Sequence, residues 1–401
     1  MTTTPTTDRI GLAWQIGTEF GWGQYGWQIV RRLSERGSLL PIPLVPPAPL
    51  DLDGIERALW SPARRAHKHT LAAIEAHGNR PLTLDLPVLH ARGNGGAVMF
   101  AGVAERVRGR RNHALVFLEN TTVAPPGLTA FRRFDRIVAG SRWNRQVLEG
   151  WGLEGVVECL QGVDPSHFHP APRTPAFPGR FVVFSAGKLE YRKGQDIVAA
   201  ALRIFCQRRP DAMLLALWNN RWPASDQARL FRHSPHLDGA DPFDSAGAID
   251  WTKWLRASGL APERHWIVTE PVAHSRLPRL IRTADVALFP NRCEGGTNLA
   301  AMEAMAAGVP TILAANTGQL DILVPEGCYP LSRQRAVTLP GRDLGTEGWG
   351  ESDLEEIVEA LERVYRDREA ARAVGLRGAT AMHELAWPGQ VDKLVNSLDL
   401  A

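Results

Sequence analysis

The stretch RFVVFSAGKLEYRKGQDIVAAALRIFCQRR, residues 180–209, decides the fold class, because a short polar loop joins an apolar run of strand length to a helical segment. A strand made almost wholly of apolar residues is buried on both faces, which is typical of parallel sheets covered by helices. The loop KLEYRKG, residues 188–194, follows the carboxyl end of that strand. Open parallel sheets bind their ligands at this edge. The stretch therefore predicts an α/β domain with a ligand site in this loop.

The same alternation of apolar runs and helical patterns extends through the whole chain. The runs are RIGLAWQI, LLPIPLV, LPVLHA, ALVFLEN, RIVAGS and VVECLQGV in the first part, and RFVVFSAG, AMLLALW, HWIVTEPV, DVALFPN and VPTILAA in the second. A chain of 401 residues is longer than the roughly 250 residues that one hydrophobic core supports. We therefore predict two doubly wound α/β domains.

The boundary between the two predicted domains falls in HFHPAPRTPAFPGR, residues 167–180. Its four prolines cannot donate backbone hydrogen bonds, so the segment is predicted to be a linker. We expect a Rossmann-like N-terminal domain over residues 1–170 and a second Rossmann-like domain that begins at residue 171. Residues 219–262 lack a clear period and are predicted to form an elaborated loop.

The net charge of +3 is too small to indicate a nucleic-acid-binding protein. The charge is uneven, since residues 1–170 carry 19 Lys and Arg against 15 Asp and Glu. The most basic segment is RVRGRRNH, residues 106–113. It is either a solvated helix end or a surface for a phosphorylated acceptor or an anionic membrane.

Other features of the composition concern location and cofactors. No window approaches the roughly 18 apolar residues of a membrane span, and the segment MTTTPTTDR lacks the pattern of a secretory signal. The four cysteines are far apart, which disfavours a zinc site and a disulfide framework. We expect a cytoplasmic protein, with peripheral contact to the inner face of the membrane through the basic N-terminal domain as a further possibility.

Two lysines mark the loop at residues 188–194. The chain has only five lysines, and Lys188 and Lys193 both lie in this loop, just before a helix. Ammonium groups beside the positive end of a helix dipole favour a bound anion such as phosphate. The alternative is a solvated connection.

A second loop with unusual residues is RCEGGTNLAAMEAMAAGVP, residues 292–310. Gly295 and Gly296 allow the backbone to approach a ligand closely, and Asn298 opens a helix. Within that helix Glu303 is the only charged residue, so its carboxylate needs a hydrogen-bonding partner. The hydroxyl groups of a ligand would serve, and a backbone N–H group or a distant Arg is the alternative.

At these residues the chain resembles the retaining glycosyltransferases of family 4, which have the GT-B fold. The loop GKLEYRKG is similar to the family pattern G-R-L-x-x-x-K-G, with Lys188 in the usual Arg position. The other similar segments are AGSRWNRQVLEGWGL with LQGVDPSHFHP, EGGTNLAAMEAMAAGVPTI, and HELAWPGQVDKLVNSL. The resemblance implies two Rossmann-like domains that face a central cleft. It also implies a second domain over residues 171–383 and a helix within residues 384–401 that returns to the first domain.

The resemblance assigns roles to residues of the second domain. Lys188 and Lys193 would neutralise the donor diphosphate and act in catalysis, while Glu303 would bind the ribose hydroxyls. Glu294 would contact the transferred sugar, although eight residues separate it from Glu303 where the family has seven. Either a one-residue bulge brings Glu294 to the sugar or the sugar is held differently. The other donor-binding candidates are Gly295, Gly296, Thr297, Asn298 and Leu299.

In the first domain the stretch GWGQYG, residues 21–26, has the G-x-G-x-x-G spacing of an NAD site. Such a site needs an acidic residue about 20 positions further on, at the end of the next strand. Here the next strand is LLPIPLV, and no acidic residue follows it until Asp51. We therefore expect a glycine-rich loop in which Gly21 and Gly23 approach the donor. His90, at an expected strand end, is either catalytic or structural. The candidates for the acceptor side are Trp22, Glu119 and Asn120.

The predicted function is transfer of a hexose-type sugar, with retention, from a UDP- or GDP-sugar to a hydroxyl of a saccharide or lipid-linked acceptor. No metal is expected, and the D-x-D pattern at residues 51–53 is attributed to chance. Two alternatives remain. One is a sugar-nucleotide or glycan-binding protein with weak catalysis, and the other is a sugar-nucleotide epimerase of the same fold.

Overall fold

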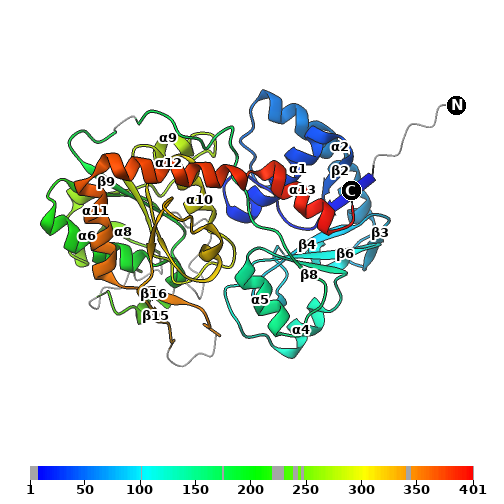
Figure 1. Ribbon diagram of the computed structural model, residues 1–401. Coiled ribbons are helices and arrows are strands. Elements are labelled where there is room, and N and C mark those ends of the chain that lie inside the picture. The colour runs from blue at the N-terminus through cyan, green and yellow to red at the C-terminus, as the bar shows by residue number, and fades with distance from the viewer. Residues whose placement is uncertain are drawn as a thin grey trace. The chain divides into compact units, whose positions relative to one another are not determined.

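The computed structural model describes residues 8–100, 102–173, 176–218, 230–237, 243–244, 248–339 and 345–400. It divides the chain into two compact units (Figure 1). Unit 1 comprises Met1–Gly162 with Trp387–Ala401, and unit 2 comprises Val163–Ala386. Each unit contains a parallel six-stranded sheet with helices, so the predicted α/β class is confirmed.

Unit 1 is built on a sheet with the strand order β2-β1-β4-β6-β7-β8. Its strands are β1 (Asp8–Leu12), β2 (Leu39–Pro43), β4 (Val88–Arg92), β6 (Asn112–Val116), β7 (Arg136–Ala139) and β8 (Val156–Glu158), and a separate pair joins β3 (Leu82–Leu84) to β5 (Val107–Gly109). Its helices are α1 (Gly21–Arg36), α2 (Gly54–Ala76), η1 (Asn94–Gly96), α3 (Val103–Arg106), α4 (Pro125–Phe131), α5 (Arg142–Gly150) and α13 (Trp387–Ser397). The strand order reverses between β1 and β4, so the ligand-binding crevice of this sheet is expected there.

Unit 2 is built on a sheet with the strand order β11-β10-β9-β12-β13-β14. Its strands are β9 (Phe181–Ala186), β10 (Ala212–Leu217), β11 (His265–Ile267), β12 (Val286–Phe289), β13 (Thr311–Ala314) and β14 (Tyr329–Leu331), with β15 (Gln334–Ala336) and β16 (Gly350–Ser352) as an antiparallel pair. Its helices are η2 (Tyr191–Lys193), α6 (Gln195–Arg208), η3 (Leu230–His233), α8 (Trp251–Ala257), η4 (Pro262–Arg264), α9 (Leu277–Ile281), α10 (Leu299–Ala306), η5 (Thr317–Ile322), α11 (Leu354–Arg366) and α12 (Arg368–Glu384). Here the strand order reverses between β9 and β12.

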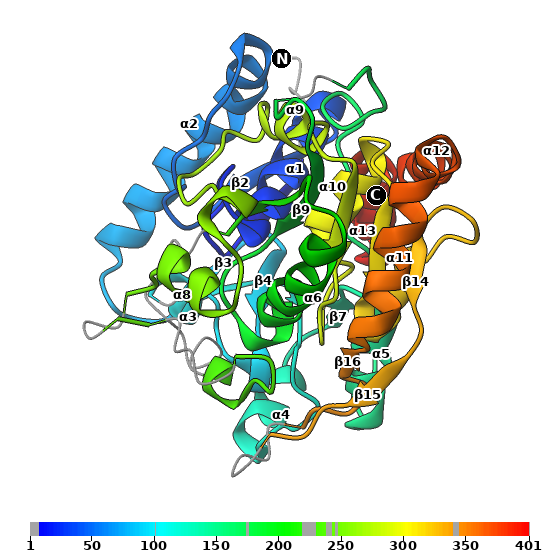
Figure 2. The ribbon, with the colours of Figure 1, turned by 90° about the vertical axis from the view of Figure 1, so that its left-hand side faces the viewer.

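Strand β9 is apolar except for Ser185 because helices cover both faces of its sheet. Phe181 packs against Phe205 of α6 and Tyr365 of α11, and these two helices lie side by side (Figure 2). Phe184 belongs instead to a buried cluster that includes Met305 of α10. Since neighbouring residues of a strand point to opposite faces, the apolar run at residues 181–186 is the expected consequence of two covered faces.

Part of the predicted linker belongs to unit 2, so the division comes earlier than the boundary expected after residue 170. Val163 forms a parallel bridge with Ala386, and both Val163 and Phe168 are buried in the core of unit 2. The prolines that suggested a free linker therefore follow a segment that is already packed. Of the predicted loop at residues 219–262, the residues 219–229, 238–242 and 245–247 lie outside the described residues, and α8 forms within the rest.

The end of the chain returns to unit 1, as the resemblance implied, although the helix begins at Trp387 instead of residue 384. Helix α13 lies beside α1 (Figure 1). The ring of Trp387 packs edge-on against Tyr25, with 5.0 Å between the ring centroids. Burial of this large aromatic pair helps to anchor the last helix.

The prediction of a glycine-rich loop at residues 21–26 is wrong, because these residues form the first turns of α1. A Cβ atom on Gly23 would lie 2.8 Å from the ring of Phe20, and one on Gly26 would lie 2.6 Å from Ile16. Both glycines therefore permit close packing of the helix on the segment that follows β1. Gly21 has open space around its Cα atom, so its lack of a side chain leaves the helix start accessible.

The expected position of His90 at a strand end is also wrong, because β4 continues to Arg92. The side chain of His90 is 1% exposed and lies 5.5 Å from the ring of Phe134, centroid to centroid. Its Nε2 atom is 3.0 Å from Oδ1 of Asn112. These contacts are those of a core histidine, which favours the structural alternative over a catalytic role.

Two buried histidines of unit 1 are expected to make the protein sensitive to acid. Burial lowers the pKa of His90 and of His113 to about 4, against about 6.5 in an unfolded chain. Protons therefore bind the unfolded chain first as the pH falls from 6.5 to 4, and stability is lost in this window. We expect each histidine to cost on the order of 1–2 kcal/mol between pH 7 and pH 5.

Urea unfolding at pH 7 and pH 5 measures this loss. The His113→Leu variant should lose part of the pH dependence, because neither ring nitrogen of His113 has a hydrogen-bond partner to replace. An equal pH dependence in the variant and the unsubstituted protein would contradict the assignment.

Neither a membrane span nor a metal cluster is found within the described ranges. No helix there combines the length and apolar character needed to cross a membrane, and no group of His, Cys, Asp and Glu side chains there could hold a metal ion. Within the D-x-D pattern, Asp53 caps α2 by accepting a hydrogen bond from the backbone N–H of Glu56 at 2.8 Å.

Candidate functional site

The two loops singled out in the second half of the sequence meet where the strand order of unit 2 reverses. The loop at residues 187–194 follows β9, the loop at residues 290–298 follows β12, and these two strands are hydrogen-bonded neighbours. The backbone N–H of Arg292 donates to the carbonyl of Arg192 at 2.7 Å. Gly194 has a φ of 70°, and a Cβ atom there would lie 2.6 Å from the carbonyl oxygen of Pro290. A glycine is therefore required where the loops touch.

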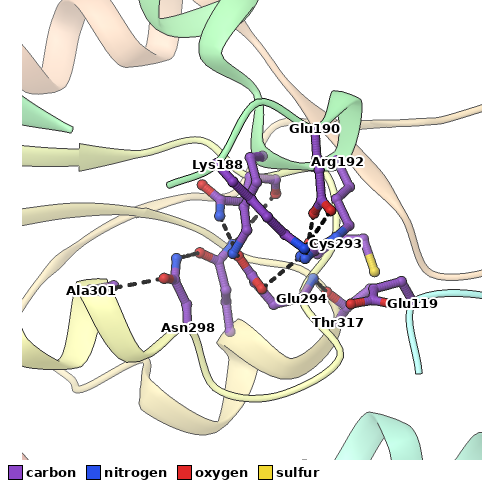
Figure 3. A network of polar contacts seen from close by, with 12 residues as sticks. Glu119, Lys188, Glu190, Arg192, Cys293, Glu294, Asn298, Ala301 and Thr317 are labelled. Carbon is purple, nitrogen blue, oxygen red and sulfur yellow. Dashed lines mark hydrogen bonds and ion pairs between the residues drawn. The ribbon is translucent and has the colours of Figure 1, made fainter. Parts of the chain in front are cut away.

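Five charged side chains from these loops form one continuous chain of ion pairs (Figure 3). Lys188 Nζ is 2.7 Å from Oε1 of Glu190, and Arg192 Nη2 is 2.6 Å from Oε2 of the same carboxylate. Arg192 Nη1 is 2.9 Å from Oε2 of Glu294, and Lys193 Nζ is 2.6 Å from its Oε1. We call this set of five residues the charge chain.

The charge chain carries three cations against two carboxylates and is largely removed from water. Burial would raise the pKa of Glu294, but Lys193 and Arg192 outweigh this effect and lower it. Burial lowers the pKa of Lys193, and Glu294 opposes that shift. With three cationic and two acidic side chains, the charge chain has one surplus positive charge, which favours an anion.

The two lysines differ in access to solvent. The side chain of Lys188 is 46% exposed, whereas that of Lys193 is 15% exposed. Lys188 is therefore able to move toward a ligand, and Lys193 is held in place by the carboxylate of Glu294. The sequence indicated both lysines but not Arg192, which joins the two carboxylates.

Glu294 is already engaged in the structure. Besides Lys193 and Arg192, its carboxylate accepts a hydrogen bond from the side-chain amide of Asn291. The backbone N–H of Glu294 donates to Oγ1 of Thr317 at 2.9 Å. Contact between Glu294 and a donor sugar stays a prediction, and it would require Glu294 to release one of these partners.

The segment that opens α10 is fixed by a neighbouring turn at η5. A Cβ atom on Gly318 would clash with the carbonyl oxygen of Gly296. Asn298 adopts a left-handed conformation with φ of 65°, and its side-chain amide donates to Oε1 of Gln319 at 2.9 Å. Its Oδ1 atom accepts from the backbone N–H of Ala301, which caps the helix.

The first turn of α10 begins directly after Asn298, and the residues before it are closely packed. Gly295, Gly296 and Thr297 are buried, and the hydroxyl of Thr297 lies 2.9 Å from the sulfur of Met302. The N–H groups of Leu299 and the next residue have no carbonyl four positions earlier within the helix, as at every helix start. These groups are available to bind an anion.

Glu303 has a partner that sequence reasoning missed. Its side chain is buried, and its Oε1 atom lies 2.8 Å from Nε2 of His274, in the segment before α9. The ring of His274 also packs at 4.9 Å from the ring of Phe168, centroid to centroid. Because His274 and Glu303 are 29 positions apart in the sequence, no local pattern could have identified the pair.

A second buried ion-pair network is centred on Arg292, in the loop after β12. Arg292 is fully buried, with Nη2 at 2.6 Å from Asp196 Oδ2 and Nε at 3.0 Å from Glu351 Oε2. Its guanidinium carbon lies 3.9 Å from the ring centroid of Tyr191. Arg292 thereby joins α6, the loop after β12 and β16.

Two of the three predicted acceptor-side residues, Glu119 and Asn120, follow the end of β6 in unit 1, and Trp22 lies in α1. Oδ1 of Asn94 accepts from the backbone N–H groups of Glu119 and Asn120 at 2.7 Å and 3.1 Å. The side-chain amide of Asn94 donates to Oε2 of Glu119 at 2.8 Å. Trp22 packs edge-on against Phe117 at 4.7 Å between centroids. Asn94, which sequence reasoning missed, therefore holds the side chain of Glu119 and the backbone of Glu119 and Asn120.

Comparison with known proteins supports the predicted family. The model of the family 4 glycosyltransferases in conflict systems matches residues 271–394, which include α10 and Glu303. The GDP-mannose-dependent alpha-(1-6)-phosphatidylinositol monomannoside mannosyltransferase of Mycolicibacterium smegmatis is 26% identical over 276 residues, covering 64% of this chain and 61% of that protein. The D-inositol 3-phosphate glycosyltransferase of Paenarthrobacter aurescens is 26% identical over 278 residues, covering 67% and 49%. These matches support a family 4 glycosyltransferase. The matches span only about half to three fifths of these relatives.

Comparison with solved structures shows that the chain has the GT-B fold. Sucrose-phosphate synthase from Thermosynechococcus elongatus has a TM-score of 0.64 and 16% identity, with 98% of each chain covered. The Anabaena protein HepE in complex with UDP-glucose has a TM-score of 0.59 and 12% identity, with 98% of this chain and 100% of that chain covered. The predicted GT-B fold is thus confirmed, and the matches support the predicted family.

Proposed function

We propose that the protein is a retaining glycosyltransferase that moves a hexose-type sugar from a nucleoside diphosphate sugar to an acceptor hydroxyl. The observation that carries the proposal is the surplus positive charge of the charge chain at the β9 and β12 loops. As the bond between sugar and diphosphate breaks, negative charge accumulates on the departing diphosphate. Fixed cations stabilise that charge more than they stabilise the bound donor, which accelerates the reaction.

The donor would be held by unit 2. Lys188 and Lys193 would contact the diphosphate, and the free N–H groups at the start of α10 would bind phosphate or sugar oxygens. The carboxylate of Glu303 would accept from the ribose hydroxyls in competition with His274. We propose UDP or GDP as the nucleotide, supported by the GDP-mannose dependence of one relative and the UDP-glucose complex of one structural neighbour.

The proposed chemistry uses no metal ion and no protein nucleophile. The lysines would supply the positive charge that a metal supplies elsewhere. The departing phosphate would accept the proton of the attacking hydroxyl on the same face of the sugar, which preserves the anomeric configuration. Glu294 would contribute through its hold on Lys193, or through the sugar if one of its partners releases it.

The acceptor would be a saccharide or lipid-linked alcohol bound by unit 1, with Glu119, Asn120 and Trp22 as candidate contacts. We also propose a cytoplasmic location. Arg106 at the end of α3 and Arg108 in β5 would then supply charge for a peripheral contact with anionic lipid.

Thermal unfolding in the presence of UDP, GDP, ADP and TDP tests donor binding. A nucleotide present at 100 times its dissociation constant adds about 2.7 kcal/mol to stability, a rise in midpoint on the order of 5 °C. We expect this rise for UDP or GDP and its loss in Glu303→Ala, but not in the exposed control Glu355→Ala. No rise with any nucleotide would contradict the proposal. A rise without sugar transfer would identify the nucleotide-binding alternative, which the altered spacing of Glu294 motivates.

A further inference from the structure

Unit 2 contains a cavity at the opposite edge of its sheet from the proposed donor site. Its volume is about 380 Å³, within the range of small-molecule pockets. Asp285 directly precedes β12 and Pro310 directly precedes β13, so the cavity lies at the amino ends of these strands. The proposed donor loops follow the carboxyl ends.

Four arginines and one carboxylate line this cavity. They are Arg173, Arg282, Arg368, Arg372 and Asp285. We call this cavity the arginine pocket. It carries three more positive than negative charges, which is an arrangement that favours an anion.

The carboxylate of Asp285 has hydrogen-bonding partners other than Arg282 and Arg372. Arg173 contacts both oxygens of Asp285, with Nη2 at 2.8 Å from Oδ2, and the backbone N–H of Val182 donates to Oδ2 at 2.7 Å. Arg368 lies further away, at 3.4 Å from Oδ1. The single negative charge is therefore paired mainly with Arg173.

The remaining guanidinium groups lack a carboxylate. Among the described residues, no Asp or Glu oxygen lies within ion-pair distance of Arg282 or Arg372, and Arg282 donates only to the carbonyl of His169, at 3.0 Å. Arg282 is partly buried, and partial burial of a cation without a counter-ion costs free energy. An anion in the pocket would remove that cost.

The positions of two arginines on α12 support the same conclusion. Arg368 and Arg372 are four residues apart on one helix face, where like charges repel each other. Arg368 is also the first residue of α12, where the helix dipole disfavours a cation. An anion bound between these side chains would offset both unfavourable terms.

The walls of the pocket are closely packed and apolar. A Cβ atom on Gly375 would clash with the carbonyl oxygen of Gly308, and a Cβ atom on Gly308 would lie 3.2 Å from Pro170. Val309 and Leu376 add apolar surface. The pocket therefore has a fixed shape with room for an organic group beside the anion.

We propose that the arginine pocket binds a phosphomonoester. Arginine donates two parallel hydrogen bonds to phosphate oxygens, which matches this anion better than a halide or a neutral ligand. The apolar walls favour an organic ester over inorganic phosphate. The site is separate from the donor loops and does not depend on the proposed transfer activity.

Isothermal titration of the Lys193→Ala variant tests this proposal, because that substitution weakens phosphate binding at the donor loops. The probes are glycerol 3-phosphate, glycerol, and vesicles that contain phosphatidic acid. We expect saturable binding of one equivalent of glycerol 3-phosphate and none of glycerol. Recruitment of the protein to these vesicles would support a lipid phosphomonoester as the source of the ligand, if Arg372→Met with Arg282→Met abolished that recruitment.

Arginine substitutions added to the Lys193→Ala variant test whether the phosphate binds in the arginine pocket. Arg372 is exposed, so Arg372→Met is expected to fold normally and to weaken binding about tenfold, as loss of one charged hydrogen bond predicts. Arg282→Met with Arg372→Met should abolish measurable binding, while Arg256→Met, at an exposed site on α8, should not change it. The proposal would be overturned if the Lys193→Ala protein did not bind glycerol 3-phosphate. It would also be overturned if Arg372→Met and the Arg282→Met, Arg372→Met double variant bound it with unchanged affinity.

Discussion

Replacing Lys193 by alanine is expected to lower the rate of sugar transfer by about 10²–10³-fold, the cost of removing one preorganised group that stabilises transition-state charge. The ammonium group is held at 2.6 Å from Glu294, so it needs little reorganisation when charge develops on the diphosphate. Its loss also leaves Arg192 as the only cation beside that carboxylate in the charge chain. We expect the decrease mainly in kcat, because the interaction strengthens as the diphosphate departs.

Steady-state assays of donor consumption measure this effect against two matched variants. Lys393→Ala removes an exposed lysine of α13 and should leave the rate unchanged. Lys188→Ala should give an intermediate loss, because its side chain is 46% exposed and more freely placed. A Lys193→Ala enzyme with at least half of the normal kcat would contradict the assigned role.

Replacing Arg292 by methionine is expected to destabilise the protein by about 3–5 kcal/mol. The guanidinium group is fully buried between Asp196 and Glu351, which are also buried. Hydrogen bonds from Arg292 and His236 outweigh burial and lower the pKa of Glu351 to about 2. Without Arg292 the carboxylate of Asp196 loses its cation in a site that excludes water, and this unpaired charge accounts for most of the cost.

Urea unfolding at pH 7 measures the loss, and two further variants test its cause. Arg335→Met removes the other arginine that contacts Glu351, but its side chain is 72% exposed, so the expected cost is below about 1 kcal/mol. Asp196→Asn introduced together with Arg292→Met should recover part of the stability, because the unpaired charge is removed. Equal destabilisation by Arg292→Met and Arg335→Met would contradict this account of the network.

The parts of the site that sequence predicted are those with a local signal. Two of only five lysines fall in one loop, and Glu303 is the one charge on an otherwise apolar helix. Both signals depend on residues close together in the chain. The covered parallel sheets were predicted for the same reason, since continuous apolar runs of strand length reveal two buried faces.

The parts that sequence could not predict depend on distant partners. Arg192 and Glu294 are 102 residues apart, and His274 reaches Glu303 from another segment. No helical or strand period connects such positions. The wrong predictions have a related cause, because Gly23 and Gly26 permit contacts of α1 with its own entry segment, and His90 packs on Phe134. In each case a tertiary contact, not a ligand, explains the residue type.

The most direct test of the central claim is nucleotide release from a panel of UDP-, GDP-, ADP- and TDP-sugars, with and without a cell lysate as acceptor source. The proposal predicts release from UDP- or GDP-sugars, stimulated by the lysate and reduced about 10²–10³-fold in Lys193→Ala. Release from none of the donors, or release that is unchanged in Lys193→Ala, would contradict the claim that the loops after β9 and β12 form the donor site.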